Sequence, residues 1–231
     1  MVQNRTWTRR VSAVVAAATL VAMVGMVTAE AATLGVGSSG PEVLALEQRL
    51  EALHYDVGAV DGNYDQRTFD AVIAFQKVAG LARTGQYTDE MAGALAGAPA
   101  APAPLVPDGG AQRVEIDLDR QVLFLYEGGA LSKILPISSG SGKRFCSEGS
   151  CRMAVTPTGS FAIYRQDRGW ETSPLGRLYN AQYFVGGYAI HGSTSVPPYP
   201  VSHGCVRIPM ASAEWFPSHV SNGMQVVVLD S

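Results

Sequence analysis

Residues 190–209 read IHGSTSVPPYPVSHGCVRIP and place His191 and His203 within fourteen residues of Cys205. An isolated thiol has a pKa of about 8.5, so a reactive cysteine needs a neighbouring base or cation to ionise near neutral pH. Histidine is the side chain best suited to that task. We expect Gly204 to let a substrate backbone approach, and the amides of Gly204 and Cys205 to stabilise an oxyanion. The stretch therefore predicts nucleophilic chemistry at Cys205.

The N-terminal segment has the order of a secretory signal. Arginines come first, at positions 5, 9 and 10, and an uncharged, largely apolar run follows over residues 11–27. Ala29-Glu30-Ala31 then fits the A-x-A pattern that signal peptidases cleave. We expect residues 1–31 to be a signal peptide, and the mature chain to be secreted or held in the cell envelope. The alternative is an uncleaved membrane anchor, because the run approaches the minimum spanning length of about 17 residues.

The composition allows a buried core and gives no reason to expect nucleic acid as a partner. Of the 231 residues, 47% are hydrophobic and 16% are charged, and the formal net charge is −3. A chain with this balance lacks the basic surface that binds the phosphates of nucleic acid.

The cysteines are Cys146, Cys151 and Cys205, and an odd number leaves at least one thiol without a partner in the chain. Cys146 and Cys151 lie close together in a Gly- and Ser-rich stretch, and for an exported chain a disulfide between them is expected. Zinc binding is the alternative, but C-x4-C without a second pair is a weak zinc signature. We therefore expect Cys205 to be the free thiol and expect no metal site.

An Ala- and Pro-rich stretch divides the chain into two parts. Residues 97–110 read GAPAAPAPLVPDGG. Alternating Ala and Pro favour an extended conformation and prevent a helix, so we expect a semi-rigid linker over residues 97–111. This linker separates a small segment, residues 34–96, from a larger one, residues 112–231.

The small segment is predicted to form a three-helix bundle. Ser39 with Glu42 can cap the first helix, and Pro41 suits its first turn. Apolar residues recur at helical spacing in each expected helix. They are Val43, Leu46, Leu50 and Leu53 in the first helix, Phe69, Val72 and Ile73 in the second, and Met91 and Leu95 in the third.

The small segment resembles the type 1 peptidoglycan-binding domain family. The likeness lies in GSSGPEVLALEQRL over residues 37–50, DGNY over 61–64 and RTFDAVIAFQ over 67–76. The resemblance implies that peptidoglycan is a partner. Sugars usually bind exposed aromatic side chains. The segment offers three that we expect to be available, namely Tyr55, Tyr64 and Tyr87. The alternative is a helical spacer that binds no ligand.

The large segment is predicted to be mainly β. Apolar and polar residues alternate over 113–118, and Gly186-Gly187 suits a two-residue hairpin between YFV and YAI. The TPTG sequence at 156–159 is expected to form a rigid turn, and a short helix over 210–216 precedes a final strand. Many short strands with Gly and Pro turns favour a β-sandwich or open barrel with one short helix.

The large segment also resembles the YkuD-type L,D-transpeptidase catalytic domain. The motif of that family is an upstream histidine followed by Ser or Thr, then His-Gly-Cys, and a polar residue two positions on. Here these residues are His191, Ser202, His203, Gly204, Cys205 and Arg207. The resemblance implies that Cys205 is the nucleophile and that His191 is the base which takes its proton. It also implies that the Gly192 carbonyl fixes the tautomer of the imidazole.

The resemblance assigns roles to the remaining motif residues. Ser202, His203 and Gly204 are expected to complete the catalytic site, with Ser202 and His203 supporting the pocket. Arg207 is expected to hold a carboxylate of the substrate through a bidentate contact, and Gly192 and Ser193 to lie against the substrate. For His203, a buried, hydrogen-bonded histidine remains an alternative to direct catalysis.

These resemblances imply an exported cysteine acyltransferase that acts on peptidoglycan stem peptides. Cys205 would attack the carbonyl of the third stem residue, a diamino acid, and expel the terminal D-Ala. An amine of a neighbouring stem would then resolve the thioester and give a 3→3 cross-link. If water resolves the thioester, the same site is an L,D-carboxypeptidase. We expect no cofactor, and we expect a carbapenem to acylate Cys205.

Two functions of other classes compete with this interpretation. A zinc peptidase would use His191, His203 and Cys205 as ligands, but no Asp or Glu stands beside them as a general base. A non-catalytic wall-binding protein would carry a degenerate site. The intact Ser-His-Gly-Cys sequence and the upstream histidine favour an enzyme over that alternative.

Overall fold

The computed structural model describes Met1 and residues 33–230. The predicted signal peptide, residues 1–31, lies outside the described residues except for Met1. Within residues 33–230, no helix combines the length and the apolar character that crossing a membrane requires.

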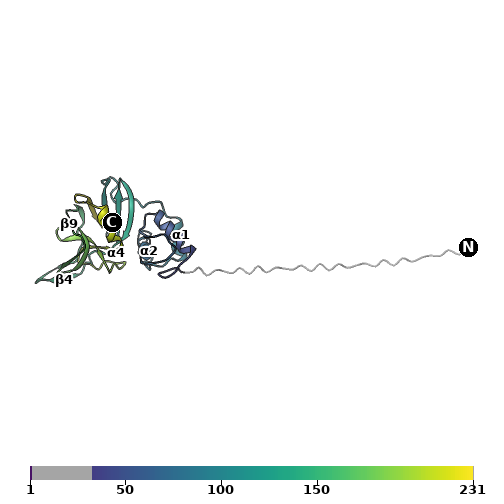
Figure 1. Ribbon diagram of the computed structural model, residues 1–231, viewed down its shortest axis with the longest axis horizontal. Helices are drawn as coiled ribbons and strands as arrows, with labels where there is room; N and C mark the ends of the chain where they lie inside the picture. Colours follow the sequence, from purple (N-terminus) through teal and green to yellow (C-terminus); the bar gives the residue numbers. More distant parts are fainter. Residues whose placement is uncertain (2–32, 231) are drawn as a thin grey trace. The chain divides into compact units, whose positions relative to one another are not determined.

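The N-terminal part is helical, as predicted (Figure 1). Its helices are α1 (Pro41–Ala52), α2 (Gln66–Val78) and α3 (Asp89–Ala96). Pro41 occupies the first turn of α1, where its missing N–H is not needed. The predicted Ser39 cap is wrong, because Gly40 is the N-cap and no side chain caps this helix. The Asp65 carboxylate caps α2 by accepting two main-chain hydrogen bonds, and the Thr88 hydroxyl caps α3.

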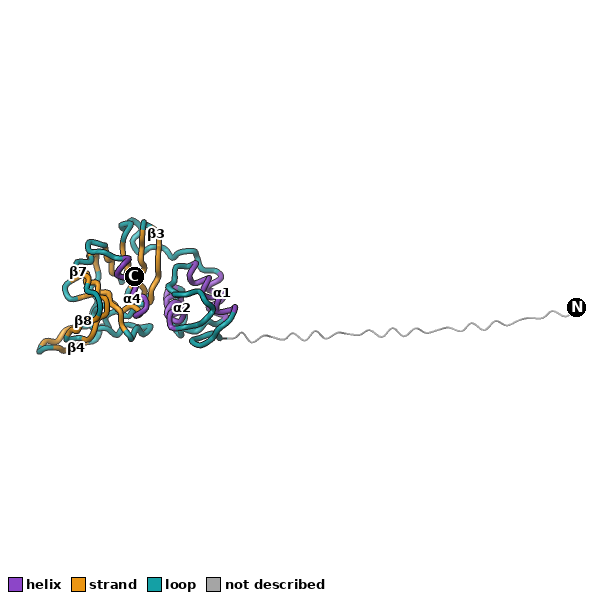
Figure 2. The backbone as a smooth tube through the Cα atoms, in the orientation of Figure 1, coloured by secondary structure: helices purple, strands orange, loops and turns teal. Residues whose placement is uncertain are grey.

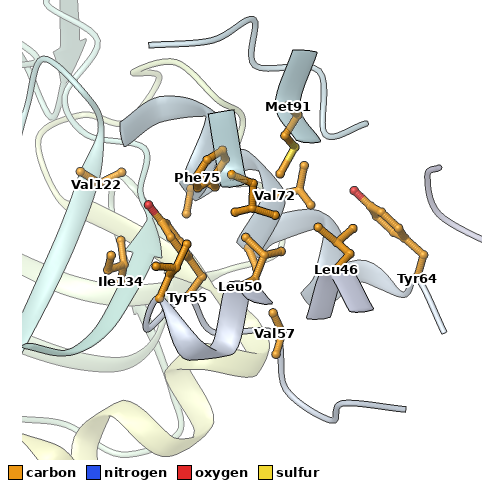
Figure 3. Close-up of a cluster of buried hydrophobic side chains, with 14 of the residues drawn as sticks. Leu46, Leu50, Tyr55, Val57, Tyr64, Val72, Phe75, Met91, Val122 and Ile134 are labelled. Carbon is orange, nitrogen blue, oxygen red and sulfur yellow. The ribbon is translucent and has the colours of Figure 1, made fainter. Parts of the chain in front are cut away.

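Apolar side chains from these helices pack into one core cluster (Figure 3). Its members include Leu46 and Leu50 of α1, Val72 and Phe75 of α2, and Met91 of α3. Tyr55 and Tyr64 belong to the same core, with only 3% and 2% of their surface exposed. Their expected availability to sugars is therefore wrong. The Tyr64 hydroxyl instead donates a hydrogen bond to the Gly85 carbonyl, which satisfies its polar tip inside the core. Tyr87 is half-buried.

The C-terminal part is mainly β, as predicted, with one helix, α4 (Met210–His219) (Figure 2). The strands are β1 (Arg113–Asp117), β2 (Val122–Glu127), β3 (Ala130–Pro136), β4 (Arg144–Ser147), β5 (Ser150–Met153), β6 (Gly159–Ala162), β7 (Arg165–Gln166), β8 (Trp170–Ser173), β9 (Gly176–Val185), β10 (Tyr188–Ser193), β11 (Val206–Pro209) and β12 (Gln225–Leu229). One sheet has the order β3-β2-β1-β12-β6. A second has the order β11-β10-β9-β7, with β8 also paired to β9, and β4 and β5 form a separate hairpin.

The two larger sheets share one core cluster. It joins Val114 of β1 and Val226 of β12 with Phe184 of β9, Ile190 of β10 and Ala213 of α4. Apolar faces of both sheets are therefore buried against each other, as in a sandwich, and α4 contributes to the same interior. This core supports the strands that carry the site residues described below.

The helical part packs directly onto β2 and β3. Tyr55 pairs with Ile134 in a parallel bridge, and the Ile134 amide donates to the His54 carbonyl at 2.8 Å. Figure 3 shows Tyr55 beside Ile134 and Val122. Along β2, positions 122, 124 and 126 belong to the helical core, and positions 123 and 125 belong to the core between the sheets. The strand is thus buried on both faces, which explains the uninterrupted apolar run VLFLY.

The second half of the linker is hydrogen-bonded to the first strand of the β part. The amides of Leu105 and Val106 donate to the Glu115 carboxylate at 2.8 and 3.4 Å. Glu115 is buried in β1 and is also paired with Arg113 at 2.7 Å. The described residues 33–230 all fall within one compact unit.

Cutting the linker should leave the two parts associated, because separation would expose the apolar face of β2 and β3. A protease site inserted after the exposed Ala101 allows this test on protein lacking residues 1–31. After cleavage, both fragments should elute together from a gel-filtration column at the volume of the uncut protein. Elution as two separate fragments in native buffer would contradict the shared core, and digestion followed by gel filtration in denaturant provides the separated control.

Candidate active site

A cavity of about 500 Å³ brings together most of the residues that the sequence singled out. Strands β4, β5, β8, β9 and β10 and the segment around β11 supply its lining. The predicted site residues that line it are His191, Ser193, Ser202, His203, Cys205 and Arg207. Gly192 and Gly204 are not among the lining residues, and both act on the site through their backbone.

The parallel pairing of β10 with β11 brings together the two segments that carry the candidate base and the candidate nucleophile. His191 and Arg207 are register partners in this pair. Cys205 lies two residues before Arg207, at the bend just ahead of β11. The side chains of all three residues line the same cavity.

His191 is held as a neutral imidazole with a defined tautomer. Its Nδ1 lies 2.9 Å from the Gly192 carbonyl, which can only accept a hydrogen bond, so Nδ1 carries the proton and Nε2 has a free lone pair. Burial lowers the pKa of His191 to about 4; the Gly192 carbonyl opposes this shift and the charge of Arg207 reinforces it. Gly192 is required here, since a Cβ would lie 2.6 Å from the Ala213 side chain.

Cys205 is a free, half-buried cysteine. Burial raises the pKa of its thiol, whereas a backbone hydrogen bond from Ala189 and the charges of Arg207 and Arg152 lower it. At neutral pH the resting site therefore pairs a thiol with a neutral imidazole. Such a pair suits general-base catalysis, in which the proton leaves the thiol as the sulfur attacks.

Ser202 closes the turn that carries the thiol. Its hydroxyl donates to the Cys205 carbonyl at 2.6 Å and accepts from the Gly204 amide at 3.0 Å. The predicted role of the Gly204 amide as an oxyanion donor is therefore wrong, because Ser202 already occupies that amide. Of the two predicted donors, the Cys205 amide is the one that remains a candidate.

Gly204 is needed for packing, and the expected approach of substrate to it is also wrong. Its φ is +135°, a left-handed conformation that favours glycine. A Cβ at this position would lie 2.4 Å from the Tyr188 ring and 2.9 Å from the Val155 carbonyl. The space beside Gly204 is thus filled by protein, and Gly204 itself is buried.

Thr156 is a site residue that sequence reasoning missed. Its hydroxyl donates to the Gly204 carbonyl at 2.7 Å and accepts from the Gly140 amide at 2.9 Å. The TPTG sequence predicted only a rigid turn, because the partners of the Thr156 hydroxyl lie 16 and 48 residues away in the chain. Thr156 connects that turn to the segment bearing Cys205.

A disulfide hairpin forms one wall of the cavity. Cys146 of β4 is joined to Cys151 of β5, directly opposite each other in the register. Phe145 and Arg152 of the same hairpin line the cavity. The Phe145 ring lies 4.7 Å from that of His203, which is exposed, so the buried alternative for His203 is wrong.

Ser193 and Arg207, which also line the cavity, both contact the Ser195 carbonyl. The Ser193 hydroxyl donates to the Ser195 carbonyl at 3.1 Å, and an Arg207 guanidinium nitrogen contacts the same carbonyl at 3.4 Å. Both residues thereby brace the segment that leads from β10 towards Ser202. Within residues 33–230, no cluster of three or more His, Cys, Asp or Glu side chains could hold a metal ion.

Replacing Thr156 with Val should weaken both stability and the reactivity of Cys205, because it removes the hydroxyl between Gly140 and Gly204. The loss should be about 1–3 kcal/mol in the free energy of unfolding, the usual cost of leaving buried polar groups unpaired. Urea unfolding and the rate of Cys205 alkylation by iodoacetamide measure the two effects. Thr158→Val in the same turn is exposed and should change neither. Equal behaviour of both variants would refute the role of Thr156.

Comparison with known proteins shows which family the chain belongs to. The family model for the L,D-transpeptidase catalytic domain, YkuD, matches residues 111–228, and that for a putative peptidoglycan binding domain matches residues 39–95. A search of curated proteins found no match.

Solved structures agree with the family models. The L,D-transpeptidase from Xylanimonas cellulosilytica is 43% identical, with a TM-score of 0.79 and coverage of 85% of this chain and 97% of that one. An L,D-transpeptidase from Stackebrandtia nassauensis shares the fold at 21% identity and a TM-score of 0.50, covering 86% and 95%. The chain therefore belongs to the L,D-transpeptidase family and carries a peptidoglycan-binding-type domain ahead of its catalytic domain.

Proposed function

We propose that this chain is an exported L,D-transpeptidase that carries an acyl group as a thioester on Cys205. The observation that supports it most directly is the free thiol of Cys205 opening on the same cavity as the neutral imidazole of His191. A nucleophile beside a base whose tautomer is fixed by a third group is the arrangement that covalent acyl transfer requires.

Each step can be assigned to atoms of this site. His191 Nε2 takes the thiol proton as Sγ bonds to the carbonyl carbon of the third stem residue, and the Cys205 amide donates to the oxyanion. The tetrahedral intermediate collapses, the bond to the terminal D-Ala breaks, and His191 gives its proton to the leaving amine. The acceptor amine then loses a proton to His191 and attacks the thioester. The C–S bond breaks and the sulfur regains its proton.

The charge of the cavity suits an anionic stem peptide. Arg152, Arg177 and Arg207 all line it, and Glu148 is the acidic residue among its lining residues. The Arg152 guanidinium lies 5.2 Å from the centre of the Phe145 ring, and that of Arg177 lies 4.2 Å from the Trp170 ring, so aromatic faces orient both. Guanidinium groups match the geometry of carboxylates, which stem peptides carry.

The helical part adds a second function, peptidoglycan binding, which its family membership supports. Export follows from the order of residues 1–31 and fits a substrate that lies outside the cytoplasm. An L,D-carboxypeptidase remains the alternative for the same site, since water in place of the acceptor amine would hydrolyse the thioester. A non-catalytic wall-binding protein is the alternative of another class.

Protein lacking residues 1–31 should convert a disaccharide-tetrapeptide, and Cys205→Ala should abolish this turnover because the nucleophile is lost. Intact mass spectrometry should show an adduct equal to the donor minus D-Ala, and chromatography should show the cross-linked dimer. Tripeptide without dimer would identify a carboxypeptidase. No turnover by folded wild-type protein would favour the non-catalytic alternative. More than a tenth of wild-type activity in Cys205→Ala would disprove the thioester mechanism.

A carbapenem should acylate Cys205, because its strained carbonyl resembles the scissile amide and ring opening leaves a thioester. Incubation with meropenem should add its full mass once, and peptide mapping should locate it at Cys205. His191→Ala should slow the reaction strongly, since the thiol would lack its base. An adduct at Cys146 or Cys151 would show that the disulfide pairing is wrong. The absence of any adduct on folded protein would count against an activated thiol.

A further inference from the structure

Lys77 is a buried charged residue that the proposed mechanism does not use. It lies in the last turn of α2 and only 1% of its surface is exposed. Burial lowers its pKa to about 7, with the charge of Arg83 adding to this shift and that of Asp70 opposing it. Burying an ammonium group is unfavourable compared with an apolar side chain of similar length. Packing alone would therefore be served better by methionine, and the lysine needs another explanation.

The ammonium group of Lys77, in the helical part, forms hydrogen bonds with the catalytic part. It donates to the carbonyl of Gln121 at 3.0 Å and to that of Ile137 at 2.8 Å. Gln121 lies just before β2, and Ile137 lies just after β3. Lys77 thus holds together the neighbouring ends of two strands.

The side chain of Gln121 forms hydrogen bonds with Ser139. The Gln121 side chain accepts from the Ser139 amide at 2.9 Å and donates to the Ser139 hydroxyl at 2.6 Å. Gln121 is buried, and its backbone φ of +61° is a left-handed conformation that the surrounding hydrogen bonds maintain. Both polar ends of the side chain therefore contact Ser139, and its nitrogen also donates to the Leu118 carbonyl at 2.6 Å.

The segment 137–141 is bonded directly to the turn that carries the nucleophile. The Ser139 carbonyl accepts from the Ser202 amide at 2.9 Å, and the Ser202 hydroxyl donates to the Cys205 carbonyl. Ser138 exchanges two main-chain hydrogen bonds with Arg207, at 3.0 and 3.1 Å. The strands and turn on either side of Cys205 therefore depend on where segment 137–141 lies.

A second contact from the helical part reaches the same region. The Arg83 guanidinium donates to the Pro198 carbonyl at 2.8 Å and to the Asp119 carbonyl at 3.3 Å. Pro198 lies in the segment between β10 and Ser202. The loop after α2 thus braces the chain ahead of the nucleophile, while Lys77 braces the segment beside it.

We propose that Lys77 is a positioning residue for Cys205, acting through Gln121, Ser139 and Ser202, so that the helical domain is part of the catalytic apparatus as well as a wall-binding module. The proposal rests on the proposed function for its consequence on turnover. The hydrogen-bonded path itself concerns the thiol and can be tested without a peptidoglycan substrate.

Lys77→Met is the main test, because it keeps the length of the side chain and removes the donor. The variant should remain folded, because removing a buried charge offsets part of the cost of taking this donor from the Gln121 and Ile137 carbonyls. On the disaccharide-tetrapeptide, kcat should fall by roughly ten-fold with little change in KM, since a small misplacement of a reacting group is enough for such a loss. The rate of Cys205 alkylation by iodoacetamide should fall in parallel.

Leu131→Ala provides a matched control within the same interface. Leu131 belongs to the helical core cluster but lies at the opposite end of β3 from Ile137. This variant should lower the Tm while leaving kcat and the alkylation rate near wild type. If Lys77→Met does not fold, Gln121→Asn replaces it. The shorter amide tolerates the left-handed backbone and keeps the carbonyl for Lys77, but it cannot span the distance to Ser139.

The outcomes separate this proposal from the proposed function. If the wild-type protein does not convert the tetrapeptide, the proposed function is disproved. The alkylation rates would still test the role of Lys77 in that case. Wild-type alkylation rates in both Lys77→Met and Gln121→Asn would overturn the positioning role. Loss of reactivity in proportion to the Tm across all variants, Leu131→Ala included, would also overturn it, because it would mean a structural effect only.

Discussion

The parallel pairing of β10 with β11 is the constraint on which the rest of the site depends. Parallel neighbours cannot be joined by a tight turn, so the chain must leave the sheet between His191 and Cys205 and return in the same direction. The register then puts His191 beside Arg207 and the thiol just ahead of β11. A slip of β11 by one residue would turn the Arg207 side chain to the face of the sheet opposite His191. Gly192, packed against α4, helps to hold this register.

The residues that the sequence identified best were those that act close together in the chain. Most of the predicted site residues line one cavity, and the Gly192 carbonyl contacts His191 as the family resemblance implied. Helical spacing and strand alternation were likewise sufficient for the helical and mainly-β parts. These features could be predicted because local periodicity and short motifs determine them.

Features that depend on contacts between distant segments could not be predicted in this way. The hydroxyl of Thr156 and the amide of Gly204 are occupied by partners that only the folded chain brings near. Tyr55 and Tyr64 carry polar tips, and whether such a residue is buried depends on what packs over it. The run VLFLY did contain a usable signal, since uninterrupted apolar strands are typically covered on both faces, which favours two packed parts over two separated ones.

The burial of β2 on both faces has a consequence for how the chain folds. Neither half can complete its interior alone, because the same strand supplies apolar side chains to both cores. The helical segment is synthesised first, but its core is complete only after β2 and β3 have been synthesised and packed against it. We therefore expect cooperative, all-or-none unfolding, with the amides of α2 and β2 exchanging with solvent at similar rates. The peptidoglycan-binding-type domain and the segment that bears Cys205 would then form in the same folding event.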